Sequence, residues 1–290
     1  MSVAHAPSAI GDRAPWRAVA VPSEHGGWGL TLEPVLVGLL VAWSGAGALI
    51  GIAAFTAFLV RTPAKLVAVD LRRHRWLERS RLALAIALTE AAVLGAAVLG
   101  AIALGGWSWL VPVAIAMPLV AIELSYEVRS RGRRLVPELC GAIGVAAAAA
   151  AIVVAGGGSG RLAAGTWLVL AARTAGAIPF VRAQIVRLRR GSGPVGASDL
   201  AQAAAVALAV FAVVLDRRLV AGAIGVAALA AAQSVWVRQA PIPPKRLGMR
   251  QLWLGLALVA IIGLMFFFAG LSGEKPIRHI EKPVTVHAPA

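Results

Sequence analysis

The chain has 290 residues, of which 59% are hydrophobic, and its mean hydropathy is +0.81. No aqueous core requires so much Ala, Val and Leu, so the composition excludes a soluble globular protein and indicates a polytopic membrane protein. The net charge of +15 does not indicate nucleic-acid binding, because the basic residues are spread over short connections and no soluble recognition module accompanies them.

The two ends of the chain differ from its apolar middle. Residues 1–21 hold Pro, Gly and scattered charge but no continuous apolar stretch, so we expect a disordered cytoplasmic lead-in rather than a cleavable signal peptide. Residues 271–290 are polar and contain Pro, which predicts a disordered extracytoplasmic tail. Residues 22–270 are expected to form a single transmembrane domain.

Nine apolar runs in this domain approach the roughly 20 residues that an α-helix needs to cross the hydrocarbon core. They cover residues 29–47, 49–70, 82–104, 107–127, 135–155, 162–180, 199–215, 219–237 and 252–270. The sequence therefore predicts an all-α fold, a polytopic membrane helix bundle of about nine transmembrane helices in the bacterial plasma membrane.

The basic residues indicate how the bundle is oriented. Of the 28 Lys and Arg residues, 22 fall in the lead-in and in or beside every second connection, while the connections SGAG, GGWSW and GGGSGR are short and nearly uncharged. The positive-inside rule then places the N-terminus in the cytoplasm and the C-terminus outside. Most of these arginines are explained by topology and by attraction to anionic lipids.

Two short patterns recur at a nearly constant separation. Pro22, Glu24 and Gly26 open the first span, as Pro137, Glu138 and Gly141 open the fifth, and Arg61-Thr62 recurs as Arg173-Thr174. Two parallel four-helix halves plus a ninth helix would produce this pattern, although chance matches in an Ala/Arg/Leu-rich chain are the alternative. If the repeat is real, the cationic helix ends of both halves face one central cytoplasmic cavity.

Four cations near prolines are candidate ligand-binding residues. Arg61 and Lys65 share a helix face on either side of Pro63, and Arg173 and Arg182 flank a stretch with Gly176 and Pro179, where we expect the sixth helix to break. Arginine forks and freed backbone N–H groups suit a phosphate or diphosphate. Alternatively, the prolines merely end helices and the cations extend to lipid head groups.

Acidic residues within apolar spans are costly unless they have a partner or a wet cavity. Glu33 and Glu123 are expected to pair with Arg61 or Arg173, and Glu138 is a further pairing candidate. Glu90 lies deepest, so it is the best candidate for a proton-handling role and is a catalytic candidate. Both the structural and the functional interpretation remain open for these residues.

The stretch PSEHGGWG, residues 22–29, leads into the first span and contains Glu24 and His25. Its glycines permit close backbone approach, and we interpret it as one lip of a cytoplasmic cavity. Glu24 would orient one of the arginines, and His25 would donate a hydrogen bond or carry a proton, so both are catalytic candidates. An ordinary interfacial turn is the alternative.

A metal site is not expected, because the other histidines lie in loops and tails, and no cofactor is predicted.

Four segments, PSEHGGWG, PELCG, RTAGAIPFVRA and PPKRLGMRQLWLG, resemble the YwiC-like family of bacterial membrane proteins over nearly the whole hydrophobic region. The nine-helix layout is also similar to the UbiA superfamily of intramembrane prenyltransferases. Those enzymes carry two Asp-rich motifs that bind Mg²⁺ and a prenyl diphosphate. The corresponding segments here hold only Asp70 in RTPAKLVAVDLRR and no acid in RTAGAIPFVRAQIVRLRR, which cannot hold two Mg²⁺ ions.

The resemblance and the departure from it suggest a UbiA-like cavity that binds an isoprenoid or other lipid phosphate, such as a polyprenyl phosphate or diphosphate, through Arg and Lys without Mg²⁺. Such a protein could be a transferase. One alternative is a proton- or ion-coupled small-molecule transporter, suggested by the repeat and the buried acids. A further alternative is an accessory factor of a respiratory complex, with no chemistry of its own.

Overall fold

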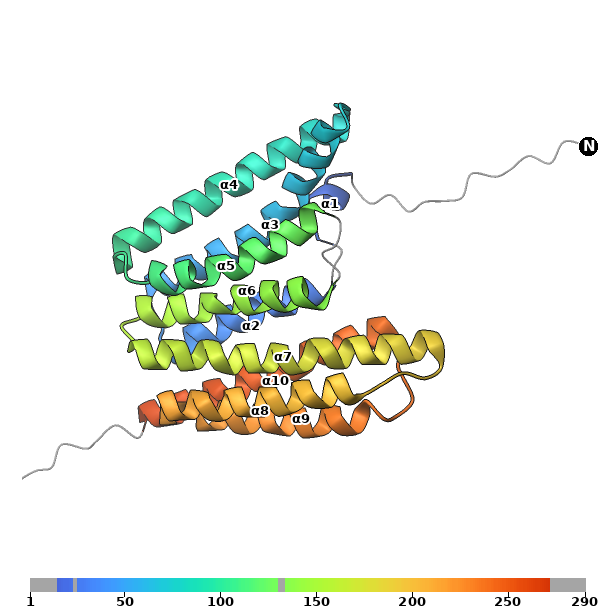
Figure 1. The fold of residues 1–290 in the computed structure, drawn as a ribbon. Coiled ribbons are helices and arrows are strands. Elements are labelled where there is room, and N and C mark those ends of the chain that lie inside the picture. The colour runs from blue at the N-terminus through green and yellow to red at the C-terminus, as the bar shows by residue number, and fades with distance from the viewer. Residues whose placement is uncertain (1–14, 23–24, 130–133, 272–290) are drawn as a thin grey trace, which may run out of the picture.

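The computed structural model describes residues 15–22, 25–129 and 134–271, and the regular structure in these ranges is entirely helical. The first helices are α1 (Pro15–Ala20), α2 (His25–Val41), α3 (Gly45–Arg72), α4 (Glu78–Gly105) and α5 (Leu110–Val128). They are followed by α6 (Leu135–Ala155), α7 (Gly160–Arg190), α8 (Gly196–Leu215), the 3-10 turn η1 (Arg217–Leu219), α9 (Val220–Trp236) and α10 (Pro244–Leu271). Most of the long helices run side by side, with their connections at two opposite ends (Figure 1).

Within the described ranges, eight helices are long and apolar enough to cross a membrane, and α2 is a shorter apolar helix of 17 residues. These nine helices correspond one to one with the predicted spans, so the prediction of an all-α, multi-pass membrane fold is confirmed. The placement of the N-terminus in the cytoplasm and the choice of membrane remain predictions.

The boundary between the first two predicted spans was wrong by several residues. Helix α2 ends at Val41 rather than at residue 47, and α3 begins at Gly45. The reason is a cap: the Ser44 side chain accepts a hydrogen bond from the Gly47 backbone N–H at 2.9 Å, which satisfies one of the unpaired donors at the start of α3.

The predicted break in the sixth span was also wrong. Helix α7 continues through Pro179 to Arg190, and α3 likewise continues through Pro63 to Arg72. A proline inside a helix removes one backbone hydrogen bond, and long helices packed against neighbours tolerate that loss. The cations near these prolines are therefore carried on continuous helices.

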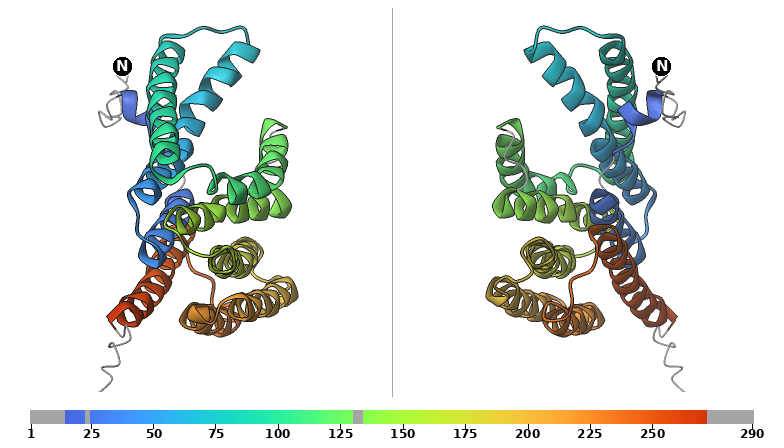
Figure 2. Two further views of the ribbon diagram at one scale, coloured as in Figure 1. Left: turned by 90° about the vertical axis from the view of Figure 1, so that its left-hand side faces the viewer. Right: turned by 90° about the vertical axis from the view of Figure 1, so that its right-hand side faces the viewer.

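Helix α2 lies in the middle of the arrangement, and it contacts α3, α6, α7 and α10 (Figure 2). Small residues allow α2 and α6 to approach closely: a Cβ added to Gly38 would come within 2.8 Å of Ile152, and one added to Gly156 would come within 2.5 Å of the Ala42 carbonyl oxygen. In lipid, such small-residue contacts are a main source of helix association. The best-packed part of the bundle therefore surrounds α2.

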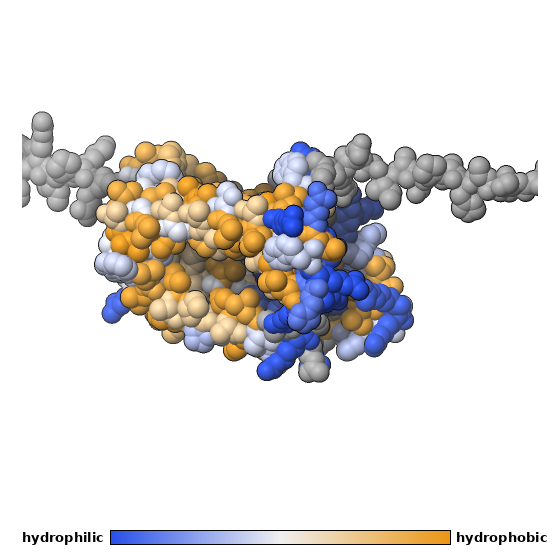
Figure 3. Space-filling model, turned by 90° about the horizontal axis from the view of Figure 1, so that it is seen from above, coloured by the Kyte–Doolittle hydropathy of each residue, from blue (hydrophilic) through white to orange (hydrophobic). Residues whose placement is uncertain are grey.

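Polar and apolar surfaces are separated along the bundle. Figure 3 shows hydrophilic side chains gathered at one end and apolar side chains covering the flank. Leu88, Leu99 and Leu104 of α4 are among the exposed apolar residues of the described chain. The apolar flank suits contact with lipid tails, and the basic end suits a head-group region that contains anionic lipids.

The predicted repeat has a counterpart in the packing. Helices α2 and α6, which would open the two halves, contact each other, and the hairpin α3–α4 corresponds in chain order to the hairpin α7–α8. The helix pairing is consistent with two parallel halves, and the repeat itself stays a prediction.

Candidate functional site

Arg61 and Lys65 of α3 lie in a cluster of four charges with two acids of α5. Arg61 donates to Glu127 from Nε at 2.9 Å and from Nη2 at 2.5 Å, and its Nη1 lies 2.8 Å from Glu123. The Nζ atom of Lys65 donates to the other oxygen of Glu127 at 2.9 Å. Two cations thus face two carboxylates, so the cluster is formally neutral.

Arg182 of α7 pairs with Glu138 at the start of α6, at a distance of 2.7 Å. Both side chains are about two-fifths exposed, at 40% and 44%. A pair this exposed contributes little to stability. It holds the start of α6 beside α7 at the basic end of the bundle.

Arg173 is placed very differently from the other three cations. It lies in the middle third of α7 with its side chain only 6% exposed, and Glu33 of α2, 9% exposed, is its nearest acid at 4.0 Å. Its Nη2 donates a hydrogen bond to the backbone carbonyl of Gln251 in α10, at 2.8 Å. A charged pair buried among apolar helices is expensive to maintain, which makes this the strongest candidate site in the described chain.

Two glycines make room for the Glu33 carboxylate. A Cβ on Gly255 of α10 would overlap this carboxylate, and a Cβ on Gly29, one helical turn before Glu33, would lie 3.6 Å from its Oε1. The acid therefore fills a space that exists because α10 carries a glycine at the contact. Glu33 and Arg173, which we name the central pair, join α2, α7 and α10 around this point.

A chain of three side-chain amides extends from the central pair towards α8 and α9. The Gln202 side-chain amide donates to the Gly176 carbonyl at 2.9 Å and to the Gln233 side chain at 3.1 Å. Gln233 in turn donates to the side-chain oxygen of Gln251 at 3.5 Å. We name Gln202, Gln233 and Gln251 the amide relay. It ends at the residue whose backbone carbonyl binds Arg173.

Two donors beside the central pair are unsatisfied. Arg173 Nε and Gln251 Nε2 are buried, and neither has a hydrogen-bond partner among the described residues. Leaving a buried donor without a partner costs about 1–3 kcal/mol, more when the group is charged. Such donors suit a ligand that supplies acceptor oxygens.

Glu90 of α4 lies apart from the central pair. It lines a pocket of about 390 Å³ between α1 and α4, together with Trp16, Ala20 and Thr89. One carboxylate oxygen, Oε2, is buried and has no hydrogen-bond partner among the described residues. Among the described residues, Glu90 thus has a mostly apolar surrounding and no cationic partner.

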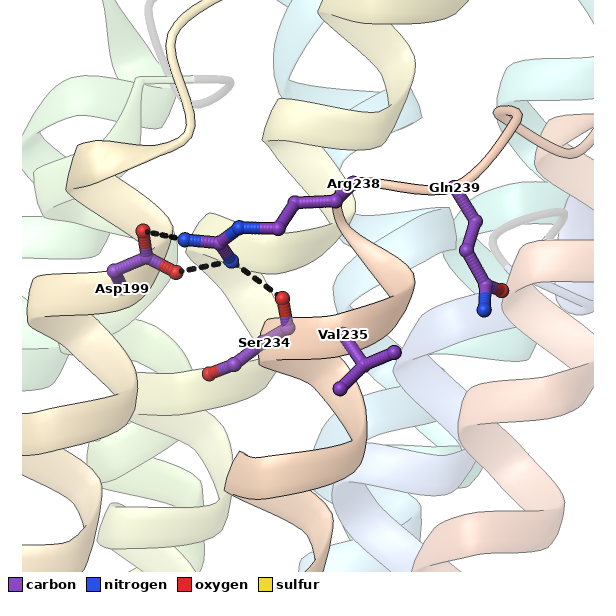
Figure 4. Close-up of a pocket in the computed structure, with 5 residues that line it drawn as sticks. All are labelled: Asp199, Ser234, Val235, Arg238 and Gln239. Carbon is purple, nitrogen blue, oxygen red and sulfur yellow. Dashed lines mark hydrogen bonds and ion pairs between the residues drawn. The ribbon is translucent and has the colours of Figure 1, made fainter.

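A second pocket, of about 750 Å³, opens between α8 and α9 near their basic ends (Figure 4). Asp199 faces Arg238 there in a two-pronged pair, with nitrogen-to-oxygen distances of 3.0 and 2.8 Å. Arg238 also donates to the Ser234 carbonyl. Hydrogen bonding to Asp199 raises the pKa of Arg238. The pair satisfies both charges, which makes it a clamp between two helices.

The stretch PSEHGGWG is only partly described. Glu24 lies outside the described residues, as does the side chain of His25, although His25 begins α2. Trp28 packs between Phe55 and Phe58 of α3, with ring centroids 5.9 and 5.3 Å away. This part of the stretch therefore anchors the start of α2 to α3.

Asp70 has a structural role. It is the single acid in RTPAKLVAVDLRR, the segment that corresponds to the first Asp-rich motif. It accepts hydrogen bonds from the Ser80 hydroxyl at 2.7 Å and from Arg79 at 3.0 and 3.3 Å, so it ties the end of α3 to the start of α4. The described residues contain no group of three or more His, Cys, Asp or Glu placed to hold a metal ion.

Sequence reasoning missed Glu127 and all three residues of the amide relay. Glu127 follows Glu123 by four residues, which places both on one helix face, so this spacing was an available signal. Gln202, Gln233 and Gln251 are polar residues within apolar spans, and such residues usually hydrogen-bond across helices.

The comparisons with known proteins concern the N-terminal half of the chain. Residues 21–155 match the family model described as YwiC-like protein. No curated protein and no solved structure matches the chain. The matched range includes Glu33, Arg61, Lys65 and Glu123, but it ends before Arg173 and the amide relay. The resemblance predicted from the sequence is thus confirmed for residues 21–155 of this multi-pass membrane protein, which are similar to the YwiC-like family.

Proposed function

We propose that the protein binds the anionic head of an isoprenoid or other lipid phosphate, without Mg²⁺, at Arg173 in the centre of the bundle. The observation that supports this most directly is the state of Arg173, a buried guanidinium that keeps an unpaired N–H and touches its counter-ion only at 4.0 Å. A phosphate oxygen supplies the missing acceptor, and its negative charge strengthens the hydrogen bond.

The other three predicted ligand cations fit this role less well. Arg61, Lys65 and Arg182 each have a carboxylate within 2.9 Å, and their side chains are 40–58% exposed. A lipid phosphate would have to compete with these carboxylates. We therefore assign them to attracting the head group at the basic end, and assign its binding to Arg173.

The proposal includes a UbiA-like arrangement of the helices. Lipid-phosphate binding is the proposed function, and a transferase reaction of the bound lipid would be a further step. Isoprenoid chains are apolar, so a bound lipid would lie along the flank of the bundle while its phosphate reaches the central pair. Without a ligand, Glu33 is the counter-ion of Arg173. When the lipid binds, its phosphate replaces the Glu33 carboxylate as the partner of the guanidinium.

The test is ligand binding to the purified protein in lipid nanodiscs with EDTA present. Geranylgeranyl phosphate should bind at micromolar concentration, and Arg173→Ala should weaken binding at least tenfold. Arg173→Lys, which keeps the charge, serves as the second variant if the alanine variant does not fold. Arg218→Gln is the control, because Arg218 pairs with Asp216 beside η1. No binding of the phosphate or the diphosphate at micromolar concentration would overturn the proposal.

A proton-coupled transporter is the second candidate, and Glu90 is the observation that favours it. An acid inside an apolar span with an unpaired, buried oxygen is the kind of group that proton pathways use. In proteoliposomes, a transporter should show proton-dependent uptake that Glu90→Gln abolishes while Glu78→Gln, at the exposed start of α4, leaves it intact. Uptake unaffected by Glu90→Gln would contradict this candidate.

A further inference from the structure

The proposed ligand contact at Arg173 has a neighbour that sequence motifs did not single out. Gln251 is joined to Arg173 through its own backbone carbonyl, and its side-chain Nε2 is buried without a partner among the described residues. Arg173 Nε is in the same state. Two unsatisfied donors, one charged and one neutral, therefore belong to residues in direct contact.

We propose that Arg173 and Gln251 together form a two-donor oxyanion site, and that the amide relay orients Gln251 towards the ligand. The inference rests on the proposed function, which needs only Arg173. It adds a second binding residue, a positioning role for Gln233 and Gln202, and a preference among phosphates.

The relay fixes which way the Gln251 amide faces. Gln233 donates to the Gln251 oxygen, so the oxygen is turned towards α9 and the NH₂ group is left for another acceptor. Gln233 is itself oriented by Gln202, which donates to it and to the Gly176 carbonyl. Each amide in a chain of this kind sets the direction of the next. Helices α8 and α9 thereby control a donor that lies on α10.

The charge balance favours a single phosphate over a diphosphate. Arg173 contributes one positive charge to the site, and the ligand takes the place of Glu33, which lies 4.0 Å away, as its partner, so this cation can balance only one negative charge of the ligand. Each additional negative charge buried in a low-dielectric interior needs its own partner. The described residues near this point offer two donors and no acidic cluster for Mg²⁺. A head group with one phosphate, bound in its less charged form, is the best match.

The experiment compares four probes on the full-length protein in nanodiscs with EDTA: geranylgeranyl phosphate, its diphosphate, the free alcohol geranylgeraniol and inorganic phosphate. The monophosphate should bind about tenfold or more tightly than the diphosphate. Comparison with inorganic phosphate distinguishes a lipid head from the free ion: equal affinity for both would mean that the site recognises phosphate alone.

Variants of the relay then test the second donor. Gln251→Leu and Gln202→Leu should each weaken monophosphate binding about tenfold, the range expected for losing a hydrogen bond to a charged group. Gln184→Leu is the matched control for Gln202→Leu, because Gln184 in α7 is as buried as Gln202 but donates to the Trp236 carbonyl, outside the relay. Gln202→Leu also keeps the test available if Gln251→Leu does not fold.

The outcomes separate the two proposals. If the monophosphate binds, Arg173 variants lose it and both relay variants bind as the wild type does, the two-donor site is wrong while the proposed function stands. Equal affinity for monophosphate and diphosphate would overturn the charge-balance argument. If neither phosphate binds, the proposed function fails and the two-donor site fails with it.

Discussion

Arg61 of α3 donates two hydrogen bonds to one oxygen of Glu127 in α5, at 2.9 and 2.5 Å, and these two helices are not among the extensively packed pairs of the bundle. Long charged side chains thus join α5 to the α3–α4 hairpin near the basic end. Lys65 adds a contact to the other oxygen of the same carboxylate.

Arg61→Gln should therefore loosen α3 from α5. We expect a loss of about 1 kcal/mol in the free energy of unfolding, because the Arg61 side chain is 41% exposed and solvent screens the pair. Thermal unfolding of the purified protein measures the effect. Arg75→Gln, in the exposed loop after α3, is the control and should change stability by less. Equal effects of both substitutions would show that the α3–α5 cluster is not a structural link.

Ser80→Ala should destabilise the turn between α3 and α4. Ser80 is fully buried and donates to Asp70 at 2.7 Å, so its loss leaves a buried carboxylate with only Arg79 as partner. The expected cost is about 1–3 kcal/mol. Amide hydrogen exchange in the turn should accelerate. Ser125→Ala, at an exposed hydroxyl that donates to a helix carbonyl, is the matched control, and acceleration in that variant too would argue against a specific role for Asp70.

Gly255→Ala should disturb the central pair, because its Cβ would overlap the Glu33 carboxylate. Glu33 would have to move away from Arg173 or α10 away from α2, and either change should lower the unfolding temperature and alter phosphate binding. Gly248→Ala on the same helix is the control, since its Cβ meets nothing within 4 Å and alanine is the better helix former. A Gly255→Ala variant as stable as Gly248→Ala would mean that this contact is readily rearranged.

The helices were predictable from the sequence because long apolar runs and arginine-rich connections are local features. Eight spans and the shorter α2 follow from run length alone. The start of α3 was missed because a single hydroxyl, that of Ser44, caps it at Gly45. The break expected near Pro179 was missed because tertiary packing, which the sequence does not display, sustains the helix.

The site was predictable only in part. Charged residues inside apolar spans pointed to Arg173 and Glu33, because charge in a membrane requires an explanation. Which acid meets which cation depends on distances between helices far apart in the chain, such as α2 and α7. The amide relay joins α8, α9 and α10, and its hydrogen bonds depend on the relative register of these three helices. The sequence does not show this register, so it did not connect Gln202, Gln233 and Gln251.

The Glu33–Arg173 pair yields the sharpest stability prediction. Glu33→Gln leaves the buried guanidinium without its counter-ion, and Arg173→Gln leaves the buried carboxylate without its own, so each substitution should cost about 3–5 kcal/mol. The double variant removes both charges and should be clearly more stable than the sum of the two single losses predicts, because no uncompensated charge remains. Thermal unfolding of the four proteins in one detergent gives the coupling. If the loss in the double variant equals the sum of the two single losses, the coupling free energy is zero. That result would show that the two charges, 4.0 Å apart, do not stabilise each other.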